Sequence, residues 1–188
     1  MCIECSAQLT GSIEQIYYFD EGRSFSMGPI VQLQNNKNWY VEARYNYEEK
    51  RTVSFYIGKS FSRDGEFSYS IVPLFGGVVG RFNGGSAGLN MDLDYKNFYF
   101  STQSQYTFSV NDEINNFYFS WSELGYQPLK WLYAGLALQE TYSPQIKETL
   151  TYPGFVVGFA YKKWTVPLYG FKTGEGTQAF VACVIYEW

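Results

Sequence analysis

Two pairs of charged residues stand at a spacing that could do chemistry. Asp92 and Asp94 are two positions apart, so in a strand their carboxylates share one face, as an acid and base pair of the glycosidase type requires. Glu42 and Arg44 have the same spacing, and their opposite charges could form an ion pair or bias the passage of ions. The simpler interpretation of both pairs is structural, namely polar residues in the wall of a sheet.

Composition excludes other familiar reactive centres. The chain contains no His, which removes the Ser-His and Cys-His nucleophile arrangements. Cys2 and Cys5 form a C-x-x-C motif, but Cys183 is the only other thiol and four zinc ligands cannot be completed. We therefore predict no catalytic residue, no metal site, no cofactor and no enzymatic activity.

The overall composition narrows the class of protein. Of the 188 residues, 21% are aromatic and 17% are charged, against about 25% charged in ordinary soluble domains. The net charge of -4 offers no basic face to a phosphate backbone, so no nucleic-acid partner is expected. No run approaches the roughly 20 apolar residues of a membrane-spanning helix. A search for long apolar runs does not detect membrane-spanning strands, because their lipid-facing and lumen-facing residues alternate.

The segments that carry the charged pairs alternate apolar and polar side chains. In "NWYVEARYNY", residues 38–47, Trp39 and Tyr45 fall on one face of a strand, and Glu42 and Arg44 fall on the other. Similar alternation occurs in the segments 52–61, 86–94, 98–105, 117–122 and 132–141. The polar faces supply the candidate lumen-lining residues Glu42, Arg44, Asp92, Asp94, Gln103, Gln105 and Tyr118.

Turn-forming residues separate these segments at about eleven places, which predicts about twelve strands, within a range of about 8 to 12. The longest connection is expected at 143–154, "SPQIKETLTYPG". No helical periodicity and no linker interrupts the pattern. We therefore predict an all-β protein with one domain, residues 8–188, built as a closed antiparallel up-and-down β-barrel.

The face that points outward decides the kind of barrel. A soluble, lipocalin-like ligand-binding barrel would enclose the aromatic face and leave an exterior of Ser, Gln, Asn, Gly and Tyr with few charges. The inverse arrangement puts Trp39, Phe55, Phe119 and Leu136 against lipid and the polar face around a wet lumen. A closed barrel also pairs every backbone group in lipid. The sequence therefore favours a transmembrane barrel.

The chain end carries the most specific pattern. "FVACVIYEW", residues 180–188, finishes on Trp188, with Tyr186, Val184 and Phe180 at alternate positions before it. In this pattern, and in its strand alternation, the chain resembles the bacterial outer-membrane β-barrels of the small porin-like class. The resemblance implies an outer-membrane location, a last strand that closes against the first, and a signature that the assembly machinery reads: Phe180, Val184, Tyr186 and Trp188.

The same resemblance implies the surroundings and orientation of the barrel. Outer-membrane lipid and lipopolysaccharide become expected partners. Both termini would lie on the periplasmic side, with the odd-numbered connections outside. Residues 1–7, "MCIECSA", are interpreted as a leader remnant, because Cys5 and Ala7 are small residues at the positions that a signal peptidase reads.

Two functions from different classes fit such a barrel. In the first, the protein is a small passive channel whose polar face binds and passes small polar solutes, sugars among them. Its charged side chains then bias the selectivity. In the second, the lumen is plugged by its own side chains and the barrel has a structural or partner-binding role. The soluble ligand-binding barrel is the third reading.

Overall fold

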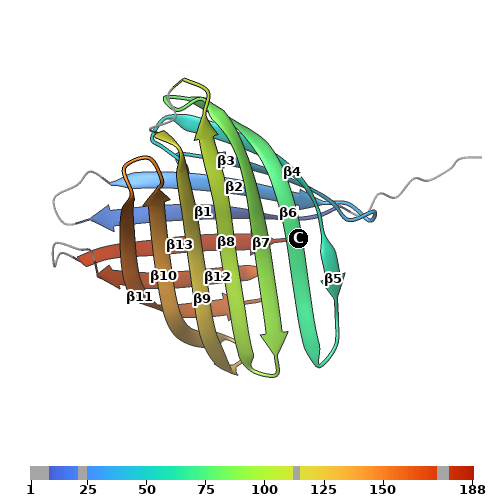
Figure 1. Ribbon diagram of the computed structural model, residues 1–188. Helices are drawn as coiled ribbons and strands as arrows, with labels where there is room; N and C mark the ends of the chain where they lie inside the picture. The colour runs from blue at the N-terminus through green and yellow to red at the C-terminus, as the bar shows by residue number, and fades with distance from the viewer. Residues whose placement is uncertain (1–8, 21–24, 112–114, 173–177) are drawn as a thin grey trace, which may run out of the picture.

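The computed structural model describes residues 9–20, 25–111, 115–172 and 178–188, most of which lie in strands (Figure 1). The strands are β1 (Thr10–Asp20), β2 (Ser26–Gln34), β3 (Trp39–Tyr45), β4 (Thr52–Lys59), β5 (Phe61–Arg63), β6 (Phe67–Gly80), β7 (Gly84–Tyr95), β8 (Phe98–Ser109), β9 (Phe117–Leu129), β10 (Leu132–Ser143), β11 (Glu148–Tyr161), β12 (Trp164–Lys172) and β13 (Gln178–Glu187). The predicted leader remnant, residues 1–7, lies outside the described residues. In the described part of the chain, no helix has the length and apolar character needed to cross a membrane.

The strands form one antiparallel sheet that closes on itself. Strands that follow one another along the chain pair from β1 to β4 and from β5 to β13, and the ring is completed by the pairs β1–β13 and β4–β6. Only Ser60 separates β4 from β5, and β5 runs along β6 beyond the point where β4 stops. β4 and β5 thus share one position in the wall. The result is a closed 12-strand barrel with one extra short strand, which confirms the predicted all-β fold.

The last strand closes the barrel as the terminal pattern predicts. β13 pairs with β1 from Ser12, opposite Glu187, to Asp20, opposite Ala179. The Tyr186 ring lies between Trp164, at a centroid distance of 4.7 Å, and Trp188, at 6.2 Å. The large ring at the chain end is therefore held by neighbouring rings, each of which contributes about 1 kcal/mol to such a contact.

The two ends of the barrel carry different connections. The end that holds the start of β1 and the end of β13 has the connections 35–38 and 64–66 and the two-residue turns 96–97, 130–131 and 162–163. Lys96 and Lys162 take φ of 56° and 57° there, as tight hairpin turns require. The opposite end carries the connections 46–51, 81–83, 110–116 and 144–147.

The connection expected to be the longest is short. β10 and β11 pair from Ser143, opposite Glu148, onward, so only residues 144–147 join them. The Thr and Tyr residues of 148–152 favour a strand, and Pro153 is accommodated opposite Leu138. The expected loop at 143–154 is therefore wrong, although the connections 46–51 and 110–116 at this end are longer than the two-residue turns at the other.

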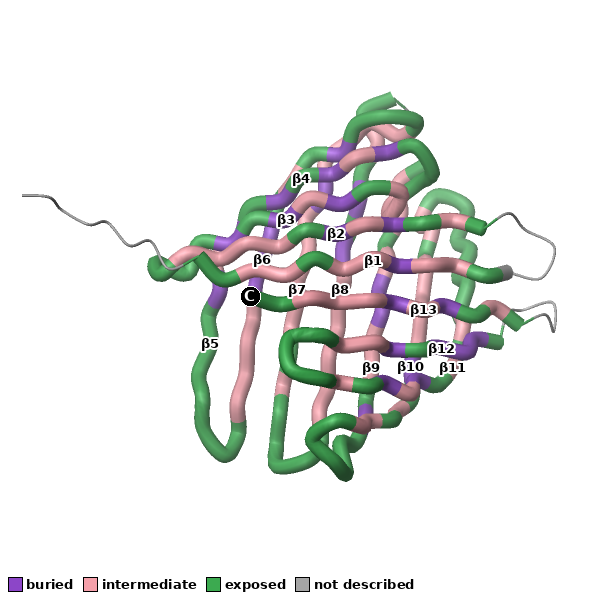
Figure 2. The backbone as a smooth tube through the Cα atoms, turned by 180° about the vertical axis from the view of Figure 1, so that it is seen from behind, coloured by how far each residue is buried: buried purple, intermediate pink, exposed green. Residues whose placement is uncertain are grey.

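Burial alternates along the strands and identifies the outward face (Figure 2). In β3, Val41 and Tyr45 are exposed, whereas Glu42 and Arg44 are buried. Large apolar side chains point outward over most of the wall, with Phe55 64% exposed. The predicted apolar exterior is thus found in most strands. The interior is mixed, because polar residues such as Glu42 and Gln105 are buried there together with apolar ones such as Leu74 and Val181.

β9 reverses the predicted arrangement. Phe119 lies opposite Gln105, whose side chain reaches the interior, and Trp121 packs on interior rings. The outward face of β9 instead carries Ser122, whose hydroxyl forms a hydrogen bond of 2.8 Å with that of Thr102. The prediction that Phe119 lies against lipid is wrong, because the interior is apolar in this sector and the aromatic face of β9 fills it.

Candidate functional site: the barrel interior

Buried charges gather inside the wall formed by β2, β3 and β4. Alternation along β3 turns Glu42 and Arg44 inward, and each is 3% exposed. The connection 46–51 also turns inward and adds Tyr47 and Glu48, whose carboxylate is fully buried beside Arg44. The charge pair predicted from the sequence is therefore part of a larger cluster.

Arg44 is the cation at the centre of this cluster. Its Nε donates to the Glu42 carboxylate, and its Nη1 lies 3.6 Å from Glu48 Oε1. The guanidinium carbon lies 4.5 Å from the ring centroid of Tyr47 and 4.6 Å from that of Tyr56. Two carboxylates and two ring faces compensate the buried charge, which would otherwise be costly to remove from water.

Further donors satisfy the Glu42 carboxylate. Gln32 Nε2 donates to its Oε2 over 3.0 Å, and Asn90 Nδ2 over 3.2 Å. The Tyr40 hydroxyl donates to the same oxygen. With Arg44 on the other oxygen, Glu42 is fully engaged by protein groups from β2, β3 and β7. Its role is to hold the network together rather than to meet a solute.

Hydrogen bonds fix the connection 46–51 inside the barrel. Glu48 accepts from Ser54 over 2.7 Å and from Tyr56 over 2.8 Å. Its neighbour Tyr47 donates to Gln103 Oε1 over 3.0 Å. Burial raises the pKa of the Tyr47 hydroxyl, so this group remains a neutral donor. The connection is thus anchored to β4 on one side and to β8 on the other.

Two of these hydrogen bonds cross the lumen. Arg44 Nη1 donates to Gln105 Oε1 over 2.6 Å, and Tyr47 donates to Gln103. β4, β6 and β7 separate β3 from β8 in the wall, so the bonds span the interior instead of following the sheet. The residues that narrow the lumen on this side form what we call the constriction cluster: Glu42, Arg44, Tyr47, Glu48, Gln103 and Gln105.

Aromatic residues fill the facing side of the interior. Trp121 of β9 packs edge-on against Tyr169 and Phe171 of β12, with ring centroids 4.9 and 5.6 Å away. Val156 and Val181 are buried in the same group. A cavity of about 60 Å³ remains between the two sides, lined by residues that include Glu14, Tyr47, Gln103, Trp121 and Glu123.

A wider cavity lies toward the end of the barrel that holds the two-residue turns. Its volume is about 360 Å³, and its lining residues come from β7 to β12. We call this cavity the acidic vestibule, because three carboxylates line it: Asp92, Asp94 and Glu123. Ser101 donates to Asp92 over 2.8 Å, and Tyr169 donates to Glu123 over 2.7 Å.

Two glycines keep the vestibule open. A Cβ on Gly158 would lie 1.9 Å from the Tyr133 ring, and one on Gly125 would lie 2.3 Å from the Tyr99 ring. Each ring therefore occupies the space that a side chain would take on the neighbouring strand. The two rings meet edge to face, with centroids 5.6 Å apart. They form part of the vestibule wall and do not block it.

The interior is acidic as a whole. Carboxylates face inward from the strands at Glu14, Glu42, Asp92, Asp94 and Glu123. Of the described strand residues that face inward, Arg44 alone is a Lys or Arg, and its charge is already compensated by Glu42 and Glu48. The vestibule therefore presents negative charge to whatever enters it.

The structure divides the candidate lumen residues into three groups. Glu42, Arg44, Gln103 and Gln105 come together in the constriction cluster, whereas Asp92 and Asp94 line the vestibule. Tyr118 lies opposite Tyr106 on the outward face and is 38% exposed. Its predicted place in the lumen needs correction, because the next residue, Phe119, takes the inward position.

The terminal signature lies on the other side of the wall. Phe180, Val184, Tyr186 and Trp188 follow the outward face of β13 and its end, and Phe180 is 48% exposed. In the part of the chain that the structure describes, no group of three or more His, Cys, Asp or Glu side chains could hold a metal ion.

Sequence reasoning missed Tyr47, Glu48 and Glu123. The first two belong to a connection with the charged run "EEKR", which is typical of a solvated turn, and only their contacts with Arg44 reveal their role. Glu123 continues the series of Phe117, Phe119 and Trp121. Because that series is predicted to face lipid, alternation alone would have placed Glu123 outside the barrel.

A closed antiparallel barrel with an apolar exterior, and with buried charges and carboxylate-lined cavities inside, has the architecture of transmembrane barrels. No family model and no curated protein sequence matches the chain. Among solved structures, it is similar to the KdgM porin in complex with disordered oligogalacturonate, with a TM-score of 0.70 and 13% identity over 94% of this chain and 99% of that one.

Two further structures agree. The NanC porin gives a TM-score of 0.68 with 9% identity over 95% of this chain and 100% of that one. OccK7 of Pseudomonas aeruginosa gives 0.53 with 10% identity over 100% of this chain and 66% of that one. The chain thus has the fold of the small outer-membrane porins.

Proposed function

We propose that this protein is an outer-membrane channel through which small neutral or cationic polar solutes diffuse passively. The observation that carries the proposal is the acidic vestibule inside a porin-like barrel. A smaller cavity shares Ser101 and Glu123 with it and is also lined by Glu14 and by residues of the constriction cluster. The rings of Tyr99 and Tyr133 give the vestibule apolar faces beside its carboxylates, a combination suited to sugars and to small organic cations.

Charge sets the expected selectivity. A monovalent ion about 6 Å from one carboxylate, at an effective dielectric constant of about 40, changes its free energy by about 1.4 kcal/mol, or tenfold in local concentration. Asp92, Asp94 and Glu123 act in the same direction on an entering ion. The similar KdgM porin was solved with oligogalacturonate, a chain of sugar acids. We propose that such polyanions are excluded from the channel described here.

The proposed role is transport and not catalysis. Asp92 accepts a hydrogen bond from Ser101 and shares the vestibule wall with Asp94, which fits a selectivity element. The outward series Phe180, Val184, Tyr186 and Trp188 supports recognition by the outer-membrane assembly machinery, and the apolar exterior supports contact with outer-membrane lipid.

A second candidate is favoured by the bonds that cross the lumen. The contacts from Arg44 to Gln105 and from Tyr47 to Gln103, together with the aromatic side of the interior, fill much of the barrel. If they stay closed, the protein is a plugged barrel with a structural or partner-binding role.

Conductance of the purified protein in a planar bilayer separates the two candidates. We expect steady channels with a cation preference that falls in Asp92→Asn and in Glu123→Gln. Glu140→Gln is the matched control, because Glu140 lies opposite Ser120 on the outward face and the variant changes the charge equally. A barrel that inserts but stays electrically silent would support the plugged alternative.

A further inference from the structure

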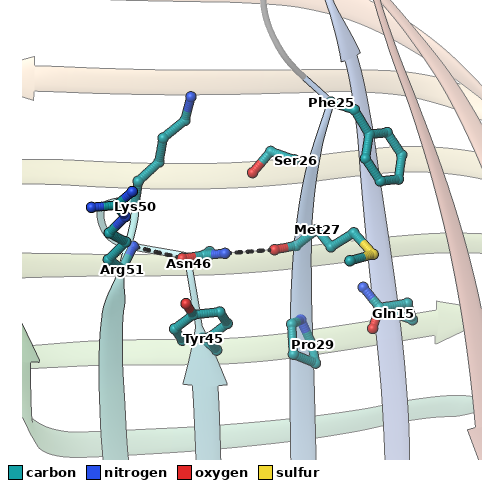
Figure 3. A pocket seen from close by; sticks show the side chains of 9 residues that line it. All are labelled: Gln15, Phe25, Ser26, Met27, Pro29, Tyr45, Asn46, Lys50 and Arg51. Atoms are coloured by element: carbon teal, nitrogen blue, oxygen red, sulfur yellow. Dashed lines mark hydrogen bonds between the residues drawn. The ribbon is translucent and has the colours of Figure 1, made fainter.

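A cleft on the outer wall of the barrel has no part in the proposed channel. Its volume is about 540 Å³, and it lies where β1, β2 and β3 approach the connection 46–51 (Figure 3). Met27 and Tyr45, which line it, are 49% and 41% exposed. They alternate with the inward residues Gly28 and Arg44, so the cleft opens outward.

The cleft results from the inward turn of the connection. Pairing between β2 and β3 ends at Ile30, opposite Arg44. In the same register Tyr47 and Glu48 would lie opposite Met27 and Ser26, but they turn into the barrel instead. The start of β2 is left without a strand neighbour on this side, and the outer surface is hollowed there.

Hydrogen bonds hold the mouth of the cleft in shape. Asn46 Nδ2 donates to the Met27 carbonyl over 3.0 Å, and the Arg51 N–H donates to Asn46 Oδ1 over 2.6 Å. Figure 3 shows Asn46 between Arg51 and Met27, bonded to both. The cations of Lys50 and Arg51 are therefore carried by a fixed turn.

The chemistry of the cleft is amphipathic. Phe25, Met27 and Tyr45 give it apolar surface, and Lys50 and Arg51 line it at the end of the wall. Both cations are exposed, and neither forms an ion pair with another described residue. Two adjacent cations above an outward apolar surface match a ligand with a phosphate head and hydrocarbon chains.

We propose that this cleft binds the phosphorylated headgroup of an outer-leaflet glycolipid, with an acyl chain along Phe25 and Met27. Arg51 supplies a planar donor pair for a phosphate, and Lys50 supplies a second positive charge. The position of the cleft agrees, because the connection 46–51 lies at the barrel end opposite the termini, which is the outer end in the proposed orientation. The inference rests on the proposed membrane location and not on the channel activity.

Native mass spectrometry tests the proposal. It measures how the purified full chain in detergent binds lipid A and the dephosphorylated form of lipid A. We expect one molecule of the phosphorylated form to bind preferentially. The double variant Lys50→Gln with Arg51→Gln should weaken that binding about thirtyfold, from about fivefold for each charge. The matched control is Lys147→Gln with Lys172→Gln, which removes two charges from the same end of the barrel, away from the cleft.

Equal binding of the two lipid forms would overturn the proposal, as would an equal loss in the control variant, which would indicate a general charge effect. Conductance measured on the same preparations tests the channel proposal independently of the lipid-site proposal. A conducting barrel without phosphate preference contradicts only the lipid site. A silent barrel that still discriminates the two lipids contradicts only the channel.

Discussion

Replacement of Arg44 by Gln tests whether the constriction cluster depends on its one cation. The change removes the guanidinium from between Glu42 and Glu48 and from above the rings of Tyr47 and Tyr56. It leaves two carboxylates in a region where Glu42 is 3% exposed. Water cannot reach them without disturbing the network.

The expected cost follows from burial. Removal of one partner from a buried, hydrogen-bonded ion pair destabilises a protein by about 3–5 kcal/mol, whereas an exposed pair contributes about 0–1 kcal/mol. We therefore expect Arg44→Gln to lower the free energy of unfolding by about 3–5 kcal/mol. The double variant with Glu42→Gln should cost less than the sum of the two single variants, because the same interaction is lost in each.

Equilibrium unfolding by urea in lipid vesicles, followed by tryptophan fluorescence, measures these values. Lys172→Gln is the control, because Lys172 is exposed and has no ion pair with another described residue. If Arg44→Gln lowers the free energy of unfolding by less than about 1 kcal/mol, the ion pair behaves like an exposed one, and the reasoning is refuted.

Three further predictions concern the lumen and the chain end. Tyr47→Phe removes the hydrogen bond to Gln103 and should cost about 1 kcal/mol, with a larger single-channel conductance because one crossing of the lumen is lost. Gly158→Ala places a methyl group where the Tyr133 ring lies, so it should cost about 1–3 kcal/mol and lower the conductance; an unchanged conductance would mean that the ring can move elsewhere. Trp188→Ala removes the ring contact at the end of β13 and should lower stability by about 1 kcal/mol and the yield of folded barrel on gels, whereas an undiminished yield contradicts a role in closure.

The sequence predicts the barrel well where one face is purely apolar and the other polar. The β3 segment, with Trp39 and Tyr45 against Glu42 and Arg44, is such a case, and the structure has the predicted faces. The prediction fails for β9, where Phe119 belongs to an aromatic series and Ser120 to a polar one. Which of the two series faces the interior depends on the side chains that lie across the lumen. Alternation fixes the period of a strand but not which face is inside.

The interior contacts could not be predicted from alternation at all. The hydrogen bond from Arg44 to Gln105 joins residues 61 positions apart in the chain. Glu48 lies in a charged turn, and its buried place depends on the direction in which the connection leaves β3. These features arise from how the barrel closes, which a local pattern does not encode.

Uptake of galactose and of galacturonate into proteoliposomes tests the central claim most directly, since the two sugars have nearly the same size and differ in one carboxylate. The account predicts faster entry of galactose, and a smaller difference between the sugars when Glu123 is replaced by Gln, because Glu123 lines the acidic vestibule. Entry of galacturonate at an equal or higher rate, or no protein-dependent entry of either sugar, would contradict it.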